Sequence, residues 1–313
     1  MVTTSHDRLA RVLQTLRMRS TFSCQADLGA PWALEMPAIA DSVSFHVVTA
    51  GSCWLRLPGA DAIELRAGDL ALVPHGAGHD LVSDAGGRRG PRVDLLPQDY
   101  VTESYSVLRH GGDGRATQLF CGIVSFDDPA ARRLMASLPA VLFIGGDTLS
   151  AASSVKDTLR LMASELSRPR VGGETVATRL ADILVIQAIR SWLADDATQT
   201  QGWVRALEDD RIGRVLEAVH ARPGDEWTLD RLARVATMSK SSFSARFAEL
   251  VDEAPISYVT RWRMTLAAAR LRDEDITAGR LSAELGYRSE AAFTRAFARV
   301  NGQTPGAMRR GRY

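Results

Sequence analysis

The chain has 313 residues, of which 45% are hydrophobic and 24% are charged, and its formal net charge is +1. No apolar run approaches the roughly 18–20 residues that cross a bilayer, the first residues lack the apolar segment of a signal peptide, and three scattered cysteines are too few for a disulfide scaffold. Membrane proteins and small disulfide-rich secreted domains are therefore excluded, and we expect a cytoplasmic protein of two domains.

The first predicted element is an amphipathic helix over residues 7–20, in which apolar residues recur at helical spacing. After Pro31 the pattern changes to short segments rich in β-branched and aromatic residues, separated by Gly and Pro. We expect strands within 45–57, 62–65, 70–73, 105–108 and 118–125. Short strands with this punctuation predict a β-sandwich or a small barrel.

One segment of this region carries a recognisable motif. Residues 68–79 have the spacing G-x5-P-x-G-x2-H, in which a turn leads into a strand and a Pro/Gly-shaped turn then directs His79 toward a barrel mouth. This resembles the second motif of cupins. The interior of such a barrel is a candidate effector pocket, although plain packing is the alternative, and its candidate lining is Phe45, Val47, Trp54, Leu72 and His79.

The histidines near this motif are the only candidate metal ligands. Cupin metalloenzymes supply two histidines and a glutamate from their first motif, whereas here His46, His75 and His79 are isolated, with no H-x-H pair and no matching Glu. Such histidines rarely form a catalytic metal site, and no triad, phosphate loop or acid/base pair stands out. We therefore expect that the protein has no cofactor and is not an enzyme. A metal-binding cupin enzyme is the less favoured alternative.

Two helices are predicted next, over 153–166 and 174–193, and the polar run 195–201 is typical of a linker. The apolar stripe of the second helix is broader than packing on one small barrel needs. A dimer interface and simple packing on the barrel are both open interpretations. The expected divisions are a sensor domain over 1–148, helices and linker over 149–202, and a helical domain over 203–313.

The last part of the chain has a helix-turn-helix pattern. A short helix over 281–285 precedes Gly286, which suits a tight turn, and Ser289 stands where an N-cap belongs. The following helix has one apolar face that includes Phe293 and Phe297, and Asn301-Gly302 and Pro305 end it. A capped second helix after such a turn can enter the major groove of DNA.

The same pattern occurs fifty residues earlier. Seven positions match at one constant offset without a gap, and the first set is Ala233, Val235, Ala236, Ser239, Phe243, Phe247 and Pro255. Repetition of both caps, both phenylalanine pairs and both prolines predicts two successive helix-turn-helix units.

These paired units, with GYRSEAAFTRAFARVNGQTPGAMRR closing the chain, resemble the AraC/XylS family of bacterial transcription regulators over residues 210–311. The cupin-like motif, with the APW and GSCWL segments, resembles the ligand domain of the same family over about 7–145. The resemblance implies an α+β chain with an N-terminal cupin-like barrel and an all-α C-terminal domain. It also implies recognition helices near 239–250 and 289–300 and a connecting helix near 256–272. The implied partners are a second copy of the chain in a homodimer, double-stranded DNA, a small-molecule effector and, if the protein is an activator, RNA polymerase.

The face opposite the phenylalanines is the one that can read DNA. Residues 203–313 hold 19 basic and 15 acidic side chains, a net charge of +4, against −3 for the rest, and this suits phosphate contact. Arg295 is the strongest candidate because arginine pairs bidentately with guanine, whereas Arg246 lies nearer the core side and can instead bond a phosphate or a carboxylate. The full set of candidates is Lys240, Ser241, Ser244, Arg246, Arg288, Glu290, Ala291, Thr294 and Arg295.

The cysteines allow a second interpretation. Cys53 and Cys121 suit small core positions, and Cys24 lies in a more polar segment before the barrel. Some regulators that this chain resembles place reactive cysteines before the first strand and in a Cys-Gly strand start, as Cys24 and Cys121 do here. That resemblance implies a thiol pair as an oxidant switch, which requires proximity and a lowered thiol pKa.

Overall fold

The computed structural model describes residues 18–126, 129–146, 154–167, 171–194 and 203–310. Its contacts divide the described residues into a strand unit, with residues 18–126, 138–146, 154–167 and 171–194, and a helical unit, with residues 129–137 and 203–310. The helix expected over 7–20 falls mostly outside the described residues, and where description begins, at Met18, the chain is already a β-strand. Among the described residues, no helix combines the length and apolar character that crossing a bilayer requires.

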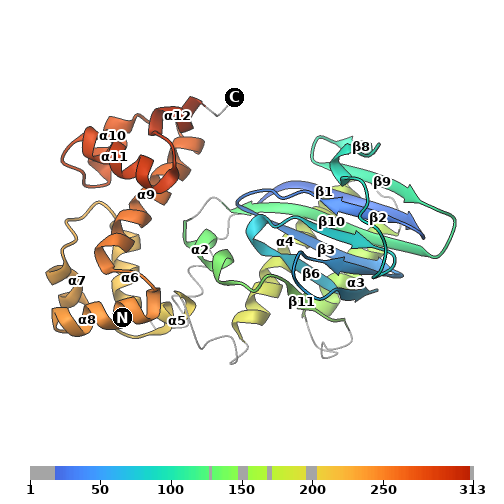
Figure 1. Cartoon of the computed structure of the whole chain (residues 1–313), viewed down its shortest axis with the longest axis horizontal. Helices are drawn as coiled ribbons and strands as arrows, with labels where there is room; N and C mark the ends of the chain where they lie inside the picture. The colour runs from blue at the N-terminus through green and yellow to red at the C-terminus, as the bar shows by residue number, and fades with distance from the viewer. Residues whose placement is uncertain (1–17, 127–128, 147–153, 168–170, 195–202, 311–313) are drawn as a thin grey trace. The chain divides into compact units, whose positions relative to one another are not determined.

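Two sheets build the strand unit (Figure 1). Seven strands lie in the order β11-β6-β3-β10-β1-β9-β8 and four in the order β2-β7-β4-β5. The bounds are β1 Met18–Gly29, β2 Ala33–Met36, β3 Ser42–Ala50, β4 Ser52–Arg56, β5 Ile63–Arg66, β6 Leu70–Val73, β7 His79–Val82, β8 Asp99–Thr102, β9 Tyr105–Gly111, β10 Ala116–Phe126 and β11 Leu142–Ile144. The two sheets are separate hydrogen-bonded ladders, so the closed barrel that the motif suggested is not what these strands form.

Apolar side chains from both sheets meet in one core. Alternation along each strand sends every second residue inward, and the buried cluster includes Val48, Cys53, Ala71, Leu81 and Cys121. Short 3-10 turns over Pro74–Gly76 and Val93–Leu95 lie between β6 and β7 and between β7 and β8, which are strands of different sheets. Cys24 belongs to this core in the middle of β1, so the prediction of a polar segment before the first strand is wrong there.

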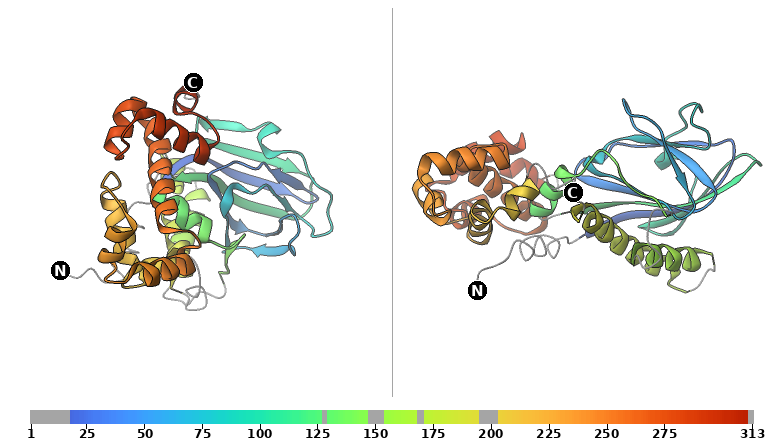
Figure 2. Two further views of the ribbon diagram at one scale, coloured as in Figure 1. Left: turned by 60° about the vertical axis from the view of Figure 1, so that its left-hand side comes forward. Right: turned by 90° about the horizontal axis from the view of Figure 1, so that it is seen from below.

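Two long helices complete the strand unit. They are α3 over Ser154–Leu166 and α4 over Gly173–Leu193, close to the predicted ranges. They contact each other and strands β1, β3 and β11 of the larger sheet, and Figure 2 shows both running along one face of the strands. Buried residues such as Leu159 and Leu184 face this packing, so at least part of the apolar stripe serves the unit itself.

The helical unit contains two similar three-dimensional motifs joined by a long helix. Its helices are α2 Pro129–Ser137, α5 Trp203–Glu208, α6 Ile212–Ala221, α7 Leu229–Val235, α8 Lys240–Val251, α9 Pro255–Asp273, α10 Ala278–Glu284, α11 Glu290–Asn301 and α12 Pro305–Arg310. Helix α9 is the expected connection and begins at Pro255, where proline suits the first helical turn. Helix α2 was not predicted, and the structure groups it with this unit although it lies within the first 148 residues.

Candidate nucleic-acid interface

Side-chain caps define both helix-turn-helix motifs in the same way. Thr228 and Thr277 accept hydrogen bonds from backbone N–H groups at the start of α7 and α10. Ser239 accepts from the N–H of Ser242 at the start of α8, and Ser289 accepts from that of Ala292 at the start of α11. Because each cap satisfies an otherwise free donor, the four helix starts are set by local sequence.

The exact offset of fifty between the two motifs is wrong in its first half. Helices α8 and α11 are fifty residues apart, but α7 and α10, with their caps Thr228 and Thr277, are forty-nine apart. The turn of the second motif contains one extra residue, so the left-handed turn position is Thr237 in the first motif and Gly286 in the second. The partner of Ala233 is therefore Ser282, and both are buried.

The four phenylalanines of the recognition helices are core residues, as predicted. Phe243, Phe247, Phe293 and Phe297 are at most 1% exposed, and the two rings within each helix lie 5.5 and 5.8 Å apart between centroids. Burial of these rings holds each recognition helix on its motif and leaves the opposite face to solvent.

Most of the candidate DNA-reading residues lie on that outward face. Ser241, Glu290, Ala291 and Arg295 are exposed, and Ser244 and Thr294 are half-buried beside them. Within the described residues, Arg295 has no ion-pair or hydrogen-bond partner, so its guanidinium is available to a ligand.

Three of the predicted basic contacts have carboxylate neighbours instead. Arg246 bonds Asp209 at 3.0 Å and Glu249 at 3.1 Å, and these bonds raise the pKa of the Arg246 guanidinium. Lys240 lies 2.8 Å from Asp230, with both side chains more than half exposed. Arg288 is 95% exposed and 3.8 Å from Glu226, too loose to hold it in place.

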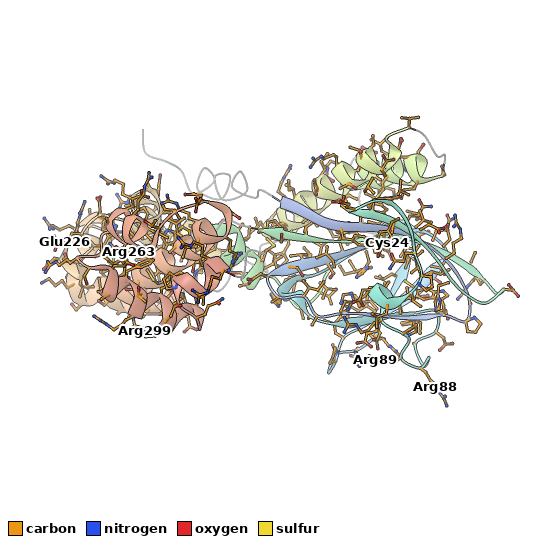
Figure 3. All side chains as sticks on the ribbon, turned by 90° about the horizontal axis from the view of Figure 1, so that it is seen from above. Cys24, Arg88, Arg89, Glu226, Arg263 and Arg299 are labelled. Carbon is orange, nitrogen blue, oxygen red and sulfur yellow. The ribbon has the colours of Figure 1, made fainter. Side chains whose placement is uncertain are left out.

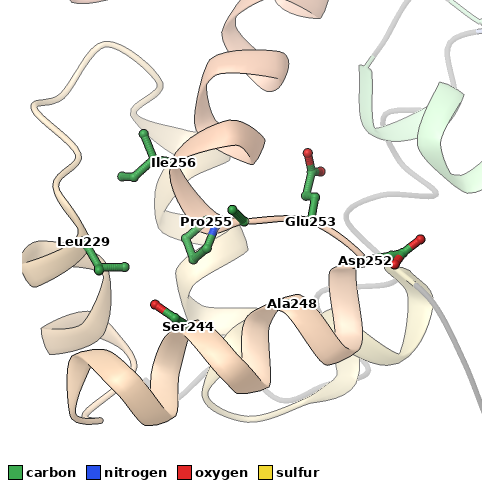
Figure 4. Close-up of a pocket in the computed structure, with 8 residues that line it drawn as sticks. Leu229, Ser244, Ala248, Asp252, Glu253, Pro255 and Ile256 are labelled. Atoms are coloured by element: carbon green, nitrogen blue, oxygen red, sulfur yellow. The ribbon is translucent and has the colours of Figure 1, made fainter.

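A shallow apolar groove borders α8 on the side of the next helix (Figure 4). Ser244 opens into it, so this hydroxyl sits between the exposed face and the corner that leads to α9. The lining residues are Leu229, Ser244, Ala248, Asp252, Glu253, Ala254, Pro255 and Ile256.

A close backbone contact joins the two motifs. A Cβ atom on Gly286 would lie 2.2 Å from the carbonyl oxygen of Gly224, and one on Gly224 would lie 2.2 Å from that of Glu284. Arg263 of α9, labelled in Figure 3, donates to the carbonyls of Pro223 and Asp225 at 2.7 Å each. The sequence pattern assigned Gly286 to a turn, but its fit against Gly224 and the role of Arg263 depend on tertiary contacts.

In the strand unit, the three cysteines share one core. Cys24 of β1 is the direct antiparallel partner of Cys121 of β10, and Cys121 is the partner of His46 of β3. Side chains at paired positions point to the same face, and Cys53 enters this core from the smaller sheet. Burial raises the pKa of all three thiols, to about 12 for Cys53, so the register supplies proximity without an activated thiolate.

Two of the three candidate metal-binding histidines come together in the same core. The Nε2 atoms of His46 and His79 are 2.7 Å apart, and burial lowers the pKa of both rings. His79 Nδ1 lies 2.9 Å from the carbonyl oxygen of Ala77 and must donate to it, so His79 Nε2 accepts from His46. His46 Nδ1 is then a buried acceptor without a partner in the described part of the chain.

His75 does not join this pair. It is exposed and has a left-handed backbone, whereas His46 and His79 are buried. Among the described residues, no group of three His, Cys, Asp or Glu side chains is placed to hold a metal ion.

The five candidate pocket residues do not line one cavity. Only His79 faces the core between the sheets. Phe45, Val47 and Leu72 alternate with the inward residues of their strands and therefore lie on the other face of the larger sheet, toward the helices. Trp54 alternates with the core residues Cys53 and Leu55 and points out of the smaller sheet. The prediction that all five line one interior is therefore wrong for Phe45, Val47, Leu72 and Trp54.

Comparison with known proteins places these two units in families. A cupin family model matches residues 7–194 and a helix-turn-helix domain model matches residues 232–311. An AraC-like transcription regulator of Streptomyces lividans is 31% identical over 308 residues, which is 97% of this chain and 98% of the relative. The HTH-type transcriptional regulator MtrA of Neisseria gonorrhoeae is 26% identical, over 97% of this chain and 98% of its own. The RCS-specific HTH-type transcriptional activator RclR of Escherichia coli is 26% identical, over 97% of each chain.

Proposed function

As this chain belongs to the family of AraC-like DNA-binding transcription regulators, we propose that its two recognition helices enter two successive major-groove segments and that the strand unit controls their engagement. The observation that carries the proposal is the duplicated, capped motif with both outward faces free of core contacts. A signal received by the strand unit would change the fraction of molecules in the conformation that binds DNA.

The length of the connecting helix supports simultaneous contact of both recognition helices with successive major-groove segments. Helix α9 has 19 residues, which at 1.5 Å per residue is about 28 Å. Successive major-groove segments on one face of DNA are about 34 Å apart. The Gly224–Gly286 contact and the bonds of Arg263 keep the second motif fixed against the first, so the spacing between the recognition helices is a built-in property.

The second motif supplies at least as much base discrimination as the first in this proposal. The outward side of α8 presents only small groups, Ser241, Ser244 and Ala245, and Arg246 is held by two carboxylates. Helix α11 presents Arg295, which can pair with guanine, and Glu290, which can accept from cytosine or stabilise the helix start.

The same chain offers a surface for a second copy. Leu161 of α3 and Val176 and Ile183 of α4 are 53%, 43% and 45% exposed, although their neighbours are buried. Val176 and Ile183 are seven residues apart and thus share a helix face. We place a homodimer contact there, and in the activator case RNA polymerase is the further partner.

Binding to the DNA upstream of its own gene tests the proposal directly. Full-length protein is titrated onto that fragment and onto a scrambled fragment of equal length at one fixed salt concentration, because phosphate contacts make affinity salt-dependent. We expect specific retention and a protected site that spans two helical turns. Equal affinity for both fragments, together with no enriched sequence after selection from randomised DNA, would contradict sequence-specific regulation.

A second candidate signal is oxidation of Cys24 and Cys121. Direct partners in an antiparallel ladder have Cα atoms about 4.5–5.5 Å apart, within the range that a disulfide needs. Hydrogen peroxide would accept two electrons and both thiol protons and leave as two water molecules, while the two sulfurs join. The raised pKa values of both thiols oppose this candidate, because the thiolate is the reactive form.

The oxidation candidate is tested on the same DNA fragment. Reduced and peroxide-treated protein are compared with Cys24→Ser and Cys121→Ser, and Cys53→Ser is the matched control from the same core. A change in affinity that needs both Cys24 and Cys121 but not Cys53 supports the switch. Identical binding in both states rejects it and leaves a small-molecule effector as the signal.

A further inference from the structure

Helix α2 is part of the helical unit, although both of its chain connections lead to the strand unit. It lies between β10 and β11 in sequence and within the range of the cupin family match. In space it contacts α5 and α9. Its place in the fold is therefore decided by contacts to the DNA-binding helices and not by its sequence neighbours.

One side chain makes the most specific of these contacts. Arg133 donates to a carboxylate oxygen of Glu253 at 2.5 Å, with the two side chains only 24% and 13% exposed. Its guanidinium carbon also lies 5.0 Å from the centre of the Tyr258 ring. A charge-assisted hydrogen bond with this little solvent exposure is stronger than a surface ion pair, and the cation–π contact adds to it.

Glu253 occupies the corner between the first recognition helix and the connecting helix. Helix α8 ends at Val251, Asp252 adopts a left-handed backbone, and α9 begins at Pro255. Arg261 of α9 donates to the same carboxylate oxygen. Desolvation and, after it, the nearby charge of Arg133 lower the pKa of Arg261 to about 10. The two arginines repel each other, and the Glu253 carboxylate between them holds the corner together.

We propose that Arg133 is a positioning residue for DNA reading, through which helix α2 sets the angle of recognition helix α8 and ties it to strands β10 and β11. The inference rests on the proposed function, because it assigns a path for the signal to that regulator. Strand β10 ends at Phe126 and β11 begins at Leu142, so the chain itself connects α2 to both strands. Release of Arg133 would then free the α8–α9 corner.

The experiment uses the full chain and the variants Arg133→Met, Arg133→Lys and Arg160→Met. Methionine keeps most of the side-chain volume, and lysine keeps the charge. Arg160 is the matched control, since it is 67% exposed and its ion pair is loose at 3.7 Å. Two quantities are measured: affinity for the upstream DNA fragment at several salt concentrations, and amide hydrogen exchange across residues 248–262 and 290–301.

For Arg133→Met we expect affinity to fall about tenfold, as loss of a charged hydrogen bond implies, with an unchanged salt slope because no phosphate contact is lost. Exchange should accelerate at residues 248–262 and stay the same at 290–301. Arg133→Lys should recover part of both effects, and Arg160→Met should behave as wild type.

Three outcomes would overturn the inference. A salt slope reduced by about one indicates that Arg133 contacts phosphate directly. Equal acceleration in both segments indicates general destabilisation, and wild-type affinity and exchange in Arg133→Met indicate that the contact positions nothing. If wild-type protein shows no specific DNA binding, the proposed function fails on its own, and the exchange data still decide whether α2 holds the α8–α9 corner.

Discussion

The two helix-turn-helix motifs have the same plan but are stabilised differently. The first has non-glycine residues, Thr237 and Asp252, at its left-handed turn and helix end, and ion pairs surround its recognition helix. The second has Gly286 and Gly302 at the corresponding positions, and its Arg295 has no ion-pair or hydrogen-bond partner in the part of the chain that the structure describes. Glycine therefore removes the cost of the left-handed backbone in the second motif, while ion pairs hold the recognition helix of the first.

The largest expected effect comes from the glycine contact between the motifs. Gly286→Ala places a methyl group against the carbonyl oxygen of Gly224 at a left-handed position, so we expect a loss of about 3 kcal/mol or more in the free energy of unfolding. Gly302→Ala is the control, because nothing lies within 4 Å of its Cβ, and only the backbone cost of about 1–2 kcal/mol applies. Urea denaturation compares them, and equal losses would mean that the close contact does not matter.

The second prediction distinguishes a side chain that contacts bases from one that stabilises the protein through ion pairs. Arg295→Ala should weaken binding to the selected DNA site by about 1–3 kcal/mol and relax preference at one base pair. Arg246→Ala should leave base preference intact, because its guanidinium is engaged by Asp209 and Glu249. Binding to a library of single-base variants measures both. If Ser241 and Ser244 changes abolished preference while Arg295→Ala preserved it, the first motif would be the main reader.

The third prediction concerns acid. His220 of α6 is buried against Trp262, with ring centroids 3.7 Å apart, and accepts or donates at Tyr258 Oη at 2.6 Å. Burial, and after it the charge of Arg133, lowers the pKa of His220 to about 3. Below an unfolded-state pKa of about 6.5 the unfolded chain binds a proton that the folded chain does not, so stability falls by up to about 1.4 kcal/mol per pH unit between these values.

The second motif lacks a histidine in sequence, so this acid effect should be confined to the first. Hydrogen exchange at pH 7 and pH 5 should show α8 and α9 opening more at the lower pH while α11 changes less. His220→Phe should flatten the pH dependence at α8. An unchanged slope in that variant would show that His220 is not the group responsible.

The smallest effect is expected from exchanging the two helix ends. Asp252→Gly removes the left-handed cost of about 1–2 kcal/mol but adds about 0.5–1 kcal/mol of unfolded-chain entropy, so the net gain in the free energy of unfolding should be at most about 1.5 kcal/mol. Gly302→Asp should lose a similar amount. Thermal unfolding of both variants measures the difference, and a gain in each would show that their surroundings outweigh backbone conformation.

Local chemistry in the sequence determined much of the helical unit. Ser239 and Ser289 cap the helices that were expected of them, the phenylalanines are buried, and Gly302 ends α11 in the left-handed conformation. These features depend on residues a few positions apart, so the spacing of the sequence is sufficient to predict them. The sequence did not predict the one-residue difference between the two turns, because several small or apolar residues in a row fit either alignment.

Tertiary structure decided what depends on distant partners. Strand register placed Cys24 beside Cys121 and turned Phe45, Val47 and Leu72 away from the core, since a shift of one residue reverses every side chain in a strand. The sequence leaves a phosphate and a carboxylate as possible partners of Arg246, and only the fold brings Asp209 beside it. The sequence of α2 has only a weak helical pattern. Its contacts to α5 and α9 are what place Arg133 beside the DNA-binding helices.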